Sequence, residues 1–472
     1  MRRRLAAATA ARRLTAITAA LCLTAALTPP TAFAERPTID PGRLPAGGRP
    51  APPDKTEQRT ICFATQPVQP GPSLPAPLRD LDVEAAWRFS MGAGQTVAVI
   101  DTGVSKHPRL PGLIPGGDYV SDKDGTEDCD VHGTVVAGLI AASRVPGEGF
   151  AGIAPQARII AIRQSSGHYQ PAGTAKRDEQ EGTVTKGGYG NVATLAAAVR
   201  HAADMGATVI NISEVACASS RINDAALGAA VQYATLVKNV VVVAAAGNKD
   251  EGSNCSAGNP DVNPLRPDAD LWDSVTTVVS PAWFDDFVLT VGSTDANGFP
   301  SGFTVPGPWV DVAAPGERMV SLDARTTGLS AAKMDDKGGV QAYSGTSFAT
   351  PLVAGVAALV RARFPHLTAQ QVMQRIEATA HHPAEGWNPY IGHGSVDALA
   401  ALTAEIGSDT EASGPESRPM AVPPPPTPPD HGPRNVALIG AGVITVLLVL
   451  GVLASIPLRK RYRLPEVGAR HV

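Results

Sequence analysis

The sequence lacks the excess of positive charge that binding to nucleic acid requires. The whole chain of 472 residues carries a formal net charge of −4. Its ends hold much of the positive charge, because residues 1–34 contain five arginines and no acidic residue, and residues 457–472 contain five basic residues and one glutamate. The part between them has a net charge of about −13. Since contacts of lysine and arginine with phosphate dominate affinity for nucleic acid, we expect no nucleic-acid partner.

The sequence also lacks a recognisable set of metal ligands. The stretch richest in acidic residues contains Asp118, Asp122, Asp124, Glu127, Asp128 and Asp130. It does not have the ligand spacing of an EF-hand, so we interpret it as a solvated acidic loop. His168 lies in a segment without core patterning, residues 164–190, and we interpret it as a solvated loop residue. We therefore expect no metal and no required cofactor.

Cysteine is scarce, with five residues in the chain. Cys22 lies in the segment that we interpret below as a signal peptide, which leaves Cys62, Cys129, Cys217 and Cys255. An even number of cysteines outside the reducing cytosol favours two disulfides over free buried thiols. Four cysteines allow three connectivities, and their positions in the chain do not choose among them.

The first 34 residues are typical of a secretory signal peptide. Arginines at positions 2–4 and 12–13 precede an apolar stretch over residues 14–27. Ala32-Phe33-Ala34 then has the small-x-small form of a cleavage site. We expect the mature protein to begin at Glu35, and an uncleaved signal anchor is the alternative.

A second apolar segment begins at Val436 and ends at Ile456, and it contains no charged residue. Its length corresponds to about 30 Å of helix, enough to cross the hydrocarbon core of a bilayer. We expect a transmembrane helix over residues 435–457 that contacts lipid. The basic tail over residues 458–472 should stay in the cytoplasm, because positive flanks remain inside.

This topology places residues 35–434 on the outer face of the cell membrane. Residues 406–434 are rich in proline, serine and glycine, and they predict an extended linker between the membrane and the preceding domain. Residues 35–90 contain many prolines and few apolar residues, so they are not expected to form a core of their own.

Three short motifs place an aspartate, a histidine and a serine in that order along the chain. Asp101 ends an apolar run over residues 96–100, His132 opens His-Gly-Thr, and Ser347 lies in Gly-Thr-Ser-Phe-Ala-Thr-Pro. A serine hydroxyl needs a base to become a nucleophile, and that base needs a third group to hold its tautomer. Each motif alone is often only the end of a strand or the start of a helix, but together they predict a catalytic triad.

Asn248 follows a fourth apolar run, residues 240–246, that predicts a buried strand. Its side-chain amide should therefore reach the same sheet edge as Asp101. Together with the backbone N–H of Ser347, this amide is suited to hold the oxyanion that forms when an acyl carbon is attacked.

Strand-like runs alternate with helical patterns through the centre of the chain. We expect strands over residues 157–162, 208–212, 240–244 and 288–291, with helices over residues 192–205 and 223–238. This alternation predicts an α/β fold in which a doubly wound, mostly parallel sheet is flanked by helices.

With these residues in place, residues 91–405 resemble the subtilisin-like serine protease family. Asp101, His132, Asn248 and Ser347 match its four signature motifs, and the triad has the subtilisin order. The resemblance implies hydrolysis of peptide bonds in polypeptide substrates through an acyl-enzyme. It also implies that Ser213, Glu214 and Val215 form the edge that binds extended substrate, although Glu214 replaces a residue that is typically apolar.

The arrangement of the whole chain is similar to the mycosins, membrane-anchored proteases of type VII secretion systems. This resemblance implies the pairing Cys62–Cys129 and Cys217–Cys255, and Cys62 would then tie residues 35–90 onto the protease as a wrapped extension. It also implies a secretion membrane complex as partner, which the domain helps to stabilise. A broad-specificity surface protease and a mainly structural component with dispensable proteolysis are the alternative functions.

Overall fold

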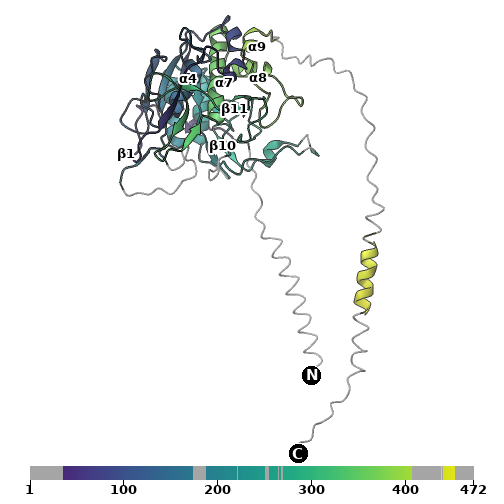
Figure 1. The fold of residues 1–472 in the computed structure, drawn as a ribbon. Helices are drawn as coiled ribbons and strands as arrows, with labels where there is room; N and C mark the ends of the chain where they lie inside the picture. Colours follow the sequence, from purple (N-terminus) through teal and green to yellow (C-terminus); the bar gives the residue numbers. More distant parts are fainter. Residues whose placement is uncertain are drawn as a thin grey trace, which may run out of the picture. The chain divides into compact units, whose positions relative to one another are not determined.

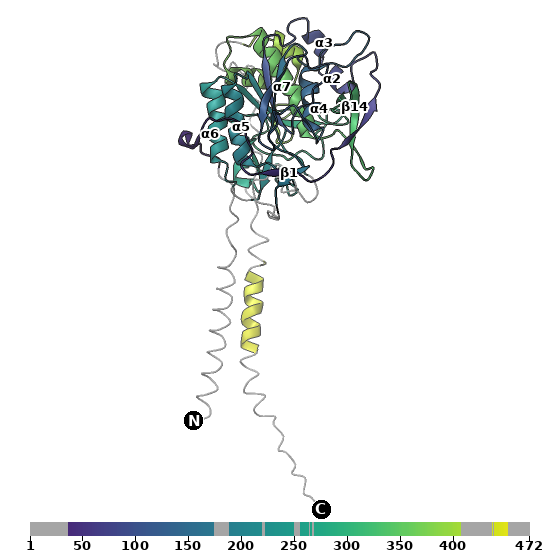
Figure 2. The same cartoon turned by 90° about the vertical axis from the view of Figure 1, so that its left-hand side faces the viewer.

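The computed structural model describes residues 36–173, 188–219, 222–249, 255–263, 265–266, 269–406, 437 and 439–451. The chain separates into two compact units, residues 1–406 and residues 407–472. The larger unit is drawn in Figures 1 and 2 with its sheet enclosed by helices.

A sheet of seven parallel strands forms the centre of the larger unit, in the order β12-β11-β9-β7-β3-β5-β4. The strands are β3 (Thr96–Asp101), β4 (Leu113–Asp118), β5 (Arg158–Arg163), β7 (Val209–Ile212), β9 (Val241–Ala245), β11 (Leu289–Thr294) and β12 (Val312–Pro315). All six residues of β3 are buried, because helices cover both faces of the sheet. The predicted doubly wound, parallel α/β fold is confirmed.

Alternate residues of β3 enter two different hydrophobic cores. Val97 and Val99 face the core that contains α4 (His132–Ala141), α7 (Thr346–Arg363), α8 (Ala369–Ala378) and α9 (Ala398–Thr403). Ala98 and Ile100 face the core under α5 (Val192–Asp204) and α6 (Ala225–Gln232). Figure 2 shows these two helical layers on opposite sides of the strands. The expected helix over residues 223–238 exists, but after α6 it continues as the π-helical turn η2 (Tyr233–Val237).

Helix α7 runs through the interior of the larger unit. Its residues 346–360 are all buried, and they are mainly alanine, valine, leucine and other small side chains. A helix that is apolar on every side can be stable only inside a core, and small residues let it approach the sheet closely. Its first turn is therefore held firmly at the carboxyl edge of the sheet, which is where Ser347 lies.

Short elements complete the larger unit. The remaining helices are η1 (Pro41–Arg43), α2 (Ala76–Arg79), α3 (Val83–Ala86) and η3 (Leu271–Ser274). The remaining strands are β1 (Thr56–Gln58), β2 (Ala64–Val68), β6 (Tyr169–Pro171), β8 (Ala216–Ala218), β10 (Val278–Ser280), β13 (Ser321–Leu322), β14 (Leu329–Met334) and β15 (Val340–Ala342).

The segment before the protease domain contributes strands to it. Strand β1 pairs antiparallel with β6, and β2 pairs antiparallel with β14 in a separate small sheet. A disulfide joins Cys62, between β1 and β2, to Cys129, and a second disulfide joins Cys217 to Cys255. This is the pairing that the family resemblance implies.

In the smaller unit, the described residues 439–451 are helical. None of the helices in the described parts of the chain has the length and apolar character that crossing a membrane requires. The predicted transmembrane segment, residues 435–457, extends beyond these described residues. The predicted signal peptide and cytoplasmic tail, and nearly all of the predicted linker, lie outside them.

Removing the disulfide at the extension should destabilise the protein. The Cys62–Cys129 bond closes a separation of 67 residues, and losing it should lower the free energy of unfolding by roughly 2–5 kcal/mol, because the unfolded chain gains conformations. We expect the full-length Cys62→Ser/Cys129→Ser variant, purified in detergent, to show a clearly lower Tm in thermal unfolding. The Cys217→Ser/Cys255→Ser variant, whose bond closes 38 residues, is the matched comparison. A Tm equal to wild type would contradict this stabilising role.

Candidate active site

Asp101 and His132 meet at the carboxyl edge of the central sheet. Asp101 is the last residue of β3 and is fully buried, and His132 is the first residue of α4. Asp101 Oδ1 lies 2.7 Å from His132 Nδ1 and also accepts a hydrogen bond from the backbone N–H of Thr102. Burial alone would lower the pKa of His132, but the charge and hydrogen bond of Asp101, with a further contribution from Glu214, raise it. The imidazole is thus held in one orientation by a carboxylate.

Close backbone contact brings these two residues together. A Cβ on Gly133 would lie 2.1 Å from the carbonyl oxygen of Gly103 and 3.1 Å from Asp101 Oδ1, so any other residue at this position would push His132 away. Val131, immediately before His132, has φ of 71°. This conformation is costly for a β-branched residue, by about 1–3 kcal/mol, and such strain persists where surrounding structure imposes it.

A buried carboxylate braces the two segments that carry Asp101 and His132. Asp128 Oδ1 accepts a hydrogen bond from the hydroxyl of Thr102, and its Oδ2 accepts hydrogen bonds from both the N–H and the hydroxyl of Thr134. Thr102 Oγ1 in turn accepts from the N–H of Gly133. Burial raises the pKa of Asp128 to about 6. Sequence reasoning did not assign Asp128 to the site.

The interpretation of residues 118–130 as a solvated acidic loop is wrong for three carboxylates. Asp118, Asp128 and Asp130 are 1%, 2% and 6% exposed. Asp118 lies 3.5 Å from the guanidinium of Arg163, and Asp130 accepts hydrogen bonds from Ser166 and Gly167. Each buried charge therefore has polar partners, which only the packing of distant segments supplies.

Ser347 lies at the amino-terminal end of α7, as its motif predicts. It is 8% exposed, and the ring of the next residue, Phe348, contacts the imidazole of His132 with 5.0 Å between ring centroids. No hydrogen bond joins Ser347 and His132 in the described residues. Hydrogen bonds of this kind are often long before a substrate is bound.

Asn248 and Ser347 border one small space next to Gly345. Asn248 Oδ1 accepts hydrogen bonds from the N–H and the hydroxyl of Thr346, which leaves its NH2 group free to donate elsewhere. A Cβ built on Gly345 would lie 3.1 Å from Asn248 Nδ2 and 3.2 Å from Ser347 Oγ. Glycine with φ of 155° keeps this space open between a donor and the candidate nucleophile.

The predicted substrate-binding residues follow β7 at the same edge. Ser213 is buried and its hydroxyl accepts a hydrogen bond from the side chain of Asn211, 2.8 Å away, while Glu214 and Val215 are half-buried. Ser165 donates a hydrogen bond to Glu214 Oε2. Burial first, and then the negative charge of Asp101, raise the pKa of Glu214 to about 8, although His132 and the Ser165 hydrogen bond act in the opposite direction.

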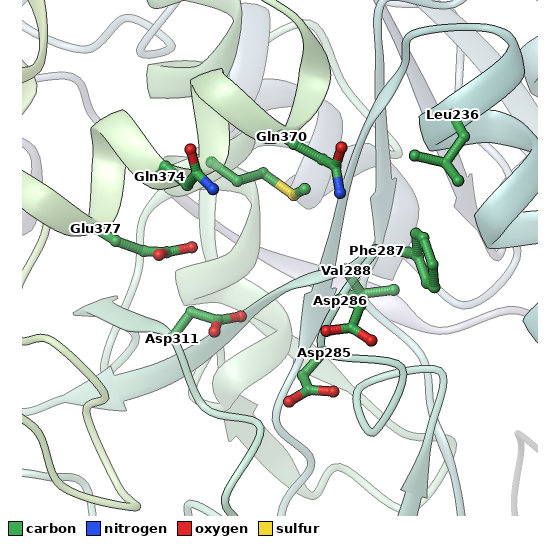
Figure 3. Close-up of a pocket in the computed structure, with 10 residues that line it drawn as sticks. Leu236, Asp285, Asp286, Phe287, Val288, Asp311, Gln370, Gln374 and Glu377 are labelled. Carbon is green, nitrogen blue, oxygen red and sulfur yellow. The ribbon is translucent and has the colours of Figure 1, made fainter. Parts of the chain in front are cut away.

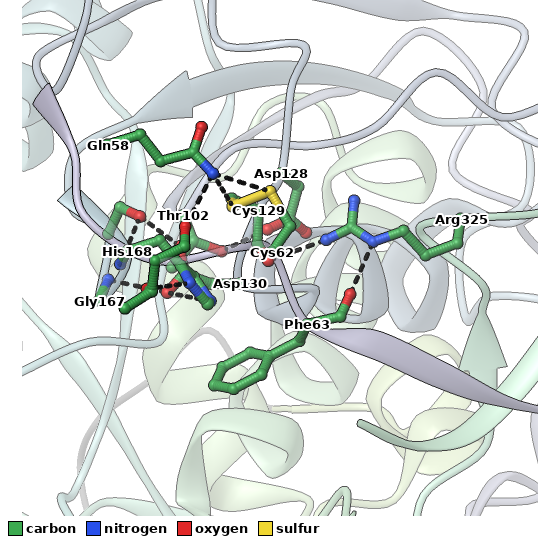
Figure 4. The surroundings of a disulfide bond; sticks show 12 residues. Gln58, Cys62, Phe63, Thr102, Asp128, Cys129, Asp130, Gly167, His168 and Arg325 are labelled. Carbon is green, nitrogen blue, oxygen red and sulfur yellow. Dashed lines mark hydrogen bonds and ion pairs between the residues drawn. A yellow bond between two sulfur atoms is a disulfide. The ribbon is translucent and has the colours of Figure 1, made fainter. Parts of the chain in front are cut away.

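His168 is not the solvated loop residue that we expected, because it is only 4% exposed. Its Nδ1 lies 2.8 Å from Thr60 Oγ1, and its ring packs edge-on against Phe63 with centroids 4.5 Å apart. Figure 4 shows His168 and Phe63 near the Cys62–Cys129 disulfide and Asp130. Burial lowers the pKa of His168. Residues 60–63 thus cover the side chain of His168, which the sequence pattern predicts to be exposed to solvent.

A separate cavity of about 490 Å³ lies at the amino-terminal ends of the strands, opposite the end that carries the candidate site. Figure 3 shows four carboxylates around it, from Asp285, Asp286, Asp311 and Glu377. Residues 285–288 and 311 immediately precede β11 and β12, so the cavity is at the amino ends of these strands. Asp101 and Asn248 follow the carboxyl ends of their strands, and the cavity is therefore not part of the candidate site.

The described residues contain no group of three or more histidine, cysteine, aspartate or glutamate side chains arranged to hold a metal ion. A serine and an amide donor border one space at this edge of the sheet, and the residue after the serine contacts an imidazole that is held by a buried carboxylate. The chemistry suited to these residues is acyl transfer.

Comparison with known proteins agrees with this geometry. Residues 92–395 match the Peptidase S8 family, the subtilases. Mycosin-4 of Mycobacterium tuberculosis is 47% identical over 455 residues, which cover 94% of this chain and 95% of the relative. A solved structure of the serine protease MycP1, an essential component of the type VII (ESX-1) secretion system, has 43% identity and a TM-score of 0.72, covering 78% of this chain and 99% of that one.

A larger assembly also contains a similar chain. In the structure of an intact ESX-5 inner membrane complex, one chain has 43% identity to this one and a TM-score of 0.74. The match covers 89% of this chain and 99% of that chain.

The raised pKa of Glu214 should appear in the pH dependence of stability. Between about pH 4.5 and 8, the folded protein keeps a proton on Glu214 that the unfolded chain has lost, so Glu214 makes stability fall as pH rises through this window. One proton limits the effect to about 1.4 kcal/mol per pH unit. We expect the Tm of Glu214→Gln, measured relative to wild type, to increase from pH 5 to pH 8. The exposed control Glu84→Gln should follow wild type, and a constant offset for Glu214→Gln would disprove the assignment.

Proposed function

This chain belongs to the subtilase family of serine proteases and, within it, to the mycosins, and we propose that Ser347, His132 and Asp101 are its nucleophile, general base and orienting carboxylate. The observation that carries the proposal is the 2.7 Å contact of the buried Asp101 with His132 Nδ1. It leaves Nε2 of the same ring to take the proton of Ser347.

The reaction follows from these roles. Ser347 Oγ attacks the carbonyl carbon of a peptide bond while His132 Nε2 accepts the hydroxyl proton. The tetrahedral intermediate collapses when the imidazolium gives that proton to the leaving amine, and the acyl-enzyme remains. Water then attacks the ester with His132 again as base, which restores Ser347 and releases the second product. Asp101 stays ionised and stabilises the imidazolium in both steps.

We propose that Asn248 Nδ2 and the backbone N–H of Ser347 hold the developing oxyanion. Their support is the shared space beside Gly345 and the amino-terminal end of α7, where the partial positive charge of the helix favours negative charge. One such side-chain donor is typically worth about 3 kcal/mol in the transition state.

Substrate recognition is assigned to the segment Ser213, Glu214 and Val215. A polypeptide can add to such an edge as an extra strand, so that main-chain hydrogen bonds hold it and side-chain pockets choose among sequences. This mode suits a selective endopeptidase better than a broad digestive one, because half-buried Glu214 places a polar carboxyl group where an apolar side chain would accept many substrates.

We further propose that the protease is anchored in the cell membrane and faces outward. The support is the uncharged segment from Val436 to Ile456, the basic tail that follows it, and the signal-like amino terminus. In this arrangement residues 35–90 are an extension wrapped on the peptidase domain over residues 91–405, and residues 406–434 link that domain to the membrane helix.

The cellular context is proposed from the relatives. MycP1 is an essential component of the type VII (ESX-1) secretion system, and an intact ESX-5 inner membrane complex includes a similar chain. We infer that this protein cleaves secretion-associated polypeptides and also stabilises such a complex by its presence. If the complex needs the folded domain but not its proteolytic activity, an inactive variant separates these two roles.

Labelling with a fluorophosphonate tests the active-site assignment. We expect the full-length protein in detergent to be labelled at Ser347 alone, as located by peptide mass spectrometry, because only an activated serine reacts quickly. Labelling should be lost in Ser347→Ala and His132→Ala. In peptide hydrolysis, kcat of Asn248→Ala should be roughly 10²- to 10³-fold lower than that of wild type, because the oxyanion is bound less tightly. Undiminished labelling of Ser347→Ala would reject Ser347 as the nucleophile.

A complementation experiment tests the double role. In cells from which the chromosomal copy is deleted, we expect Ser347→Ala to restore the amount of secretion membrane complex but not the cleavage of secreted substrates. The readouts are native gel electrophoresis of membranes and the sizes of secreted polypeptides. If Ser347→Ala restores neither, the structural role is wrong, and if it restores both, proteolysis is not performed by this chain.

A further inference from the structure

Glu214 lies directly beside the candidate triad because of strand order. Strands β5 and β7 flank β3 on its two sides, with Arg163 paired to Asp101 and Ile212 paired to Ile100. The residues that follow β5 and β7 therefore emerge on either side of Asp101. Ser165 comes from one side and Glu214 from the other.

A hydrogen bond joins these two residues across the end of β3. Ser165 donates through its hydroxyl to Glu214 Oε2, and the Ser165 backbone N–H is 3.4 Å from the carbonyl oxygen of Asp101. The bridge holds the Glu214 carboxyl close enough to both Asp101 and His132 for their charges to affect one another. Glu214 is therefore oriented, and it is only half-buried.

No cation in the described residues pairs with Glu214, although several cations are near the site. Arg163 pairs with Asp118 at 3.5 Å, and Arg325 donates to the backbone carbonyl oxygens of Phe63 and Cys129. Lys333 Nζ lies 4.8 Å from the ring centre of Phe63, and its charge acts on Glu214 and Asp101 without forming an ion pair with either in the described residues. Ser165 is the one hydrogen-bond partner of the Glu214 carboxyl in the described part of the chain.

A half-buried carboxyl group beside the ionised Asp101 gains most from a partner that brings positive charge. Without one, burial and the like charge of Asp101 favour its neutral form. Apolar substrate side chains would leave it unpaired and acidic ones would be repelled. A cation at hydrogen-bond distance from its second oxygen would form a charge-assisted hydrogen bond, which is among the stronger contacts in proteins.

We propose that Glu214 is a specificity-determining residue that binds a lysine or arginine side chain of the substrate close to the scissile bond. This inference rests on the proposed function, since it assumes that the edge formed by Ser213, Glu214 and Val215 binds polypeptide. Ser165 is the positioning residue that aims the carboxylate, and the basic side chain of the substrate supplies the ion-pair partner that none of the described residues provides.

Cleavage of a peptide library tests this selectivity. The full-length protein in detergent is incubated with a library of proteome-derived peptides, and the new termini are sequenced by mass spectrometry. We expect lysine and arginine to be enriched at one position near the cleaved bond. A synthetic peptide from the best cleaved sequence and its lysine-to-norleucine analogue then give the ratio of kcat/KM, which should be roughly 10- to 100-fold in favour of lysine.

Matched variants assign that ratio to Glu214. In Glu214→Gln the ratio should fall to within about 3-fold of one, and Glu214→Arg should favour a glutamate analogue instead. Ser165→Ala, which keeps the charge, should reduce the ratio only partly, and exposed Glu84→Gln should keep it. Because each variant is compared on two peptides, a general loss of activity cancels from the ratio.

Fluorophosphonate labelling of the same preparations distinguishes a failure of the inference about Glu214 from a failure of the proposed function. If wild type is labelled at Ser347 but shows no preference for a basic residue, or if Glu214→Gln keeps the preference, the inference is wrong while the proposed function stands. If folded wild type, with its normal thermal transition, is not labelled, the proposed function fails and the inference with it.

Discussion

The contact between Asp101 and His132 joins the end of the central strand β3 to the beginning of helix α4, and the surrounding site is arranged around it. A fully buried carboxylate is costly unless its oxygens are satisfied. Here Oδ1 meets the imidazole and the backbone of Thr102, whereas Oδ2 has no hydrogen-bond partner among the described residues, and glycine at position 133 allows the two segments to touch. The strained backbone of Val131 indicates that packing, and not local preference, sets this geometry.

Negative charge is concentrated around this contact. Asp128 and Glu214 are both near enough to Asp101 for their pKa values to be raised, after the larger effect of burial. The two differ in their surroundings, because Asp128 is buried and hydrogen-bonded to Thr102 and Thr134, whereas Glu214 is half-buried and has Ser165 as its one hydrogen-bond partner among the residues that the structure describes. Asp128 braces the site, and Glu214 is the carboxylate to which we assign a basic side chain of the substrate.

The segment before the protease domain is part of the same structure. Strand β2 pairs with β14, and the Cys62–Cys129 disulfide holds the segment three positions from His132. Phe63 contacts His168, and Thr60 lies within hydrogen-bond distance of the same ring. An extension with too few apolar residues to fold alone is thus ordered by strand pairing and one covalent bond, and it shields polar groups close to the site.

Much of this protein can be predicted from its sequence, since the informative patterns are local. Apolar runs without alternation mark β3 and β9, small apolar residues after His132 and Ser347 mark α4 and α7, and the polar residue at each boundary marks the functional edge. Three features depended on tertiary structure. They are the burial of Asp118, Asp128, Asp130 and His168, the positions of Glu214 and Ser165 on either side of Asp101, and the choice among three disulfide pairings. Each of them depends on segments far apart in the chain, which come together only when the strand order is established and the extension pairs with β14. A local pattern of residues does not show which distant segments will be in contact.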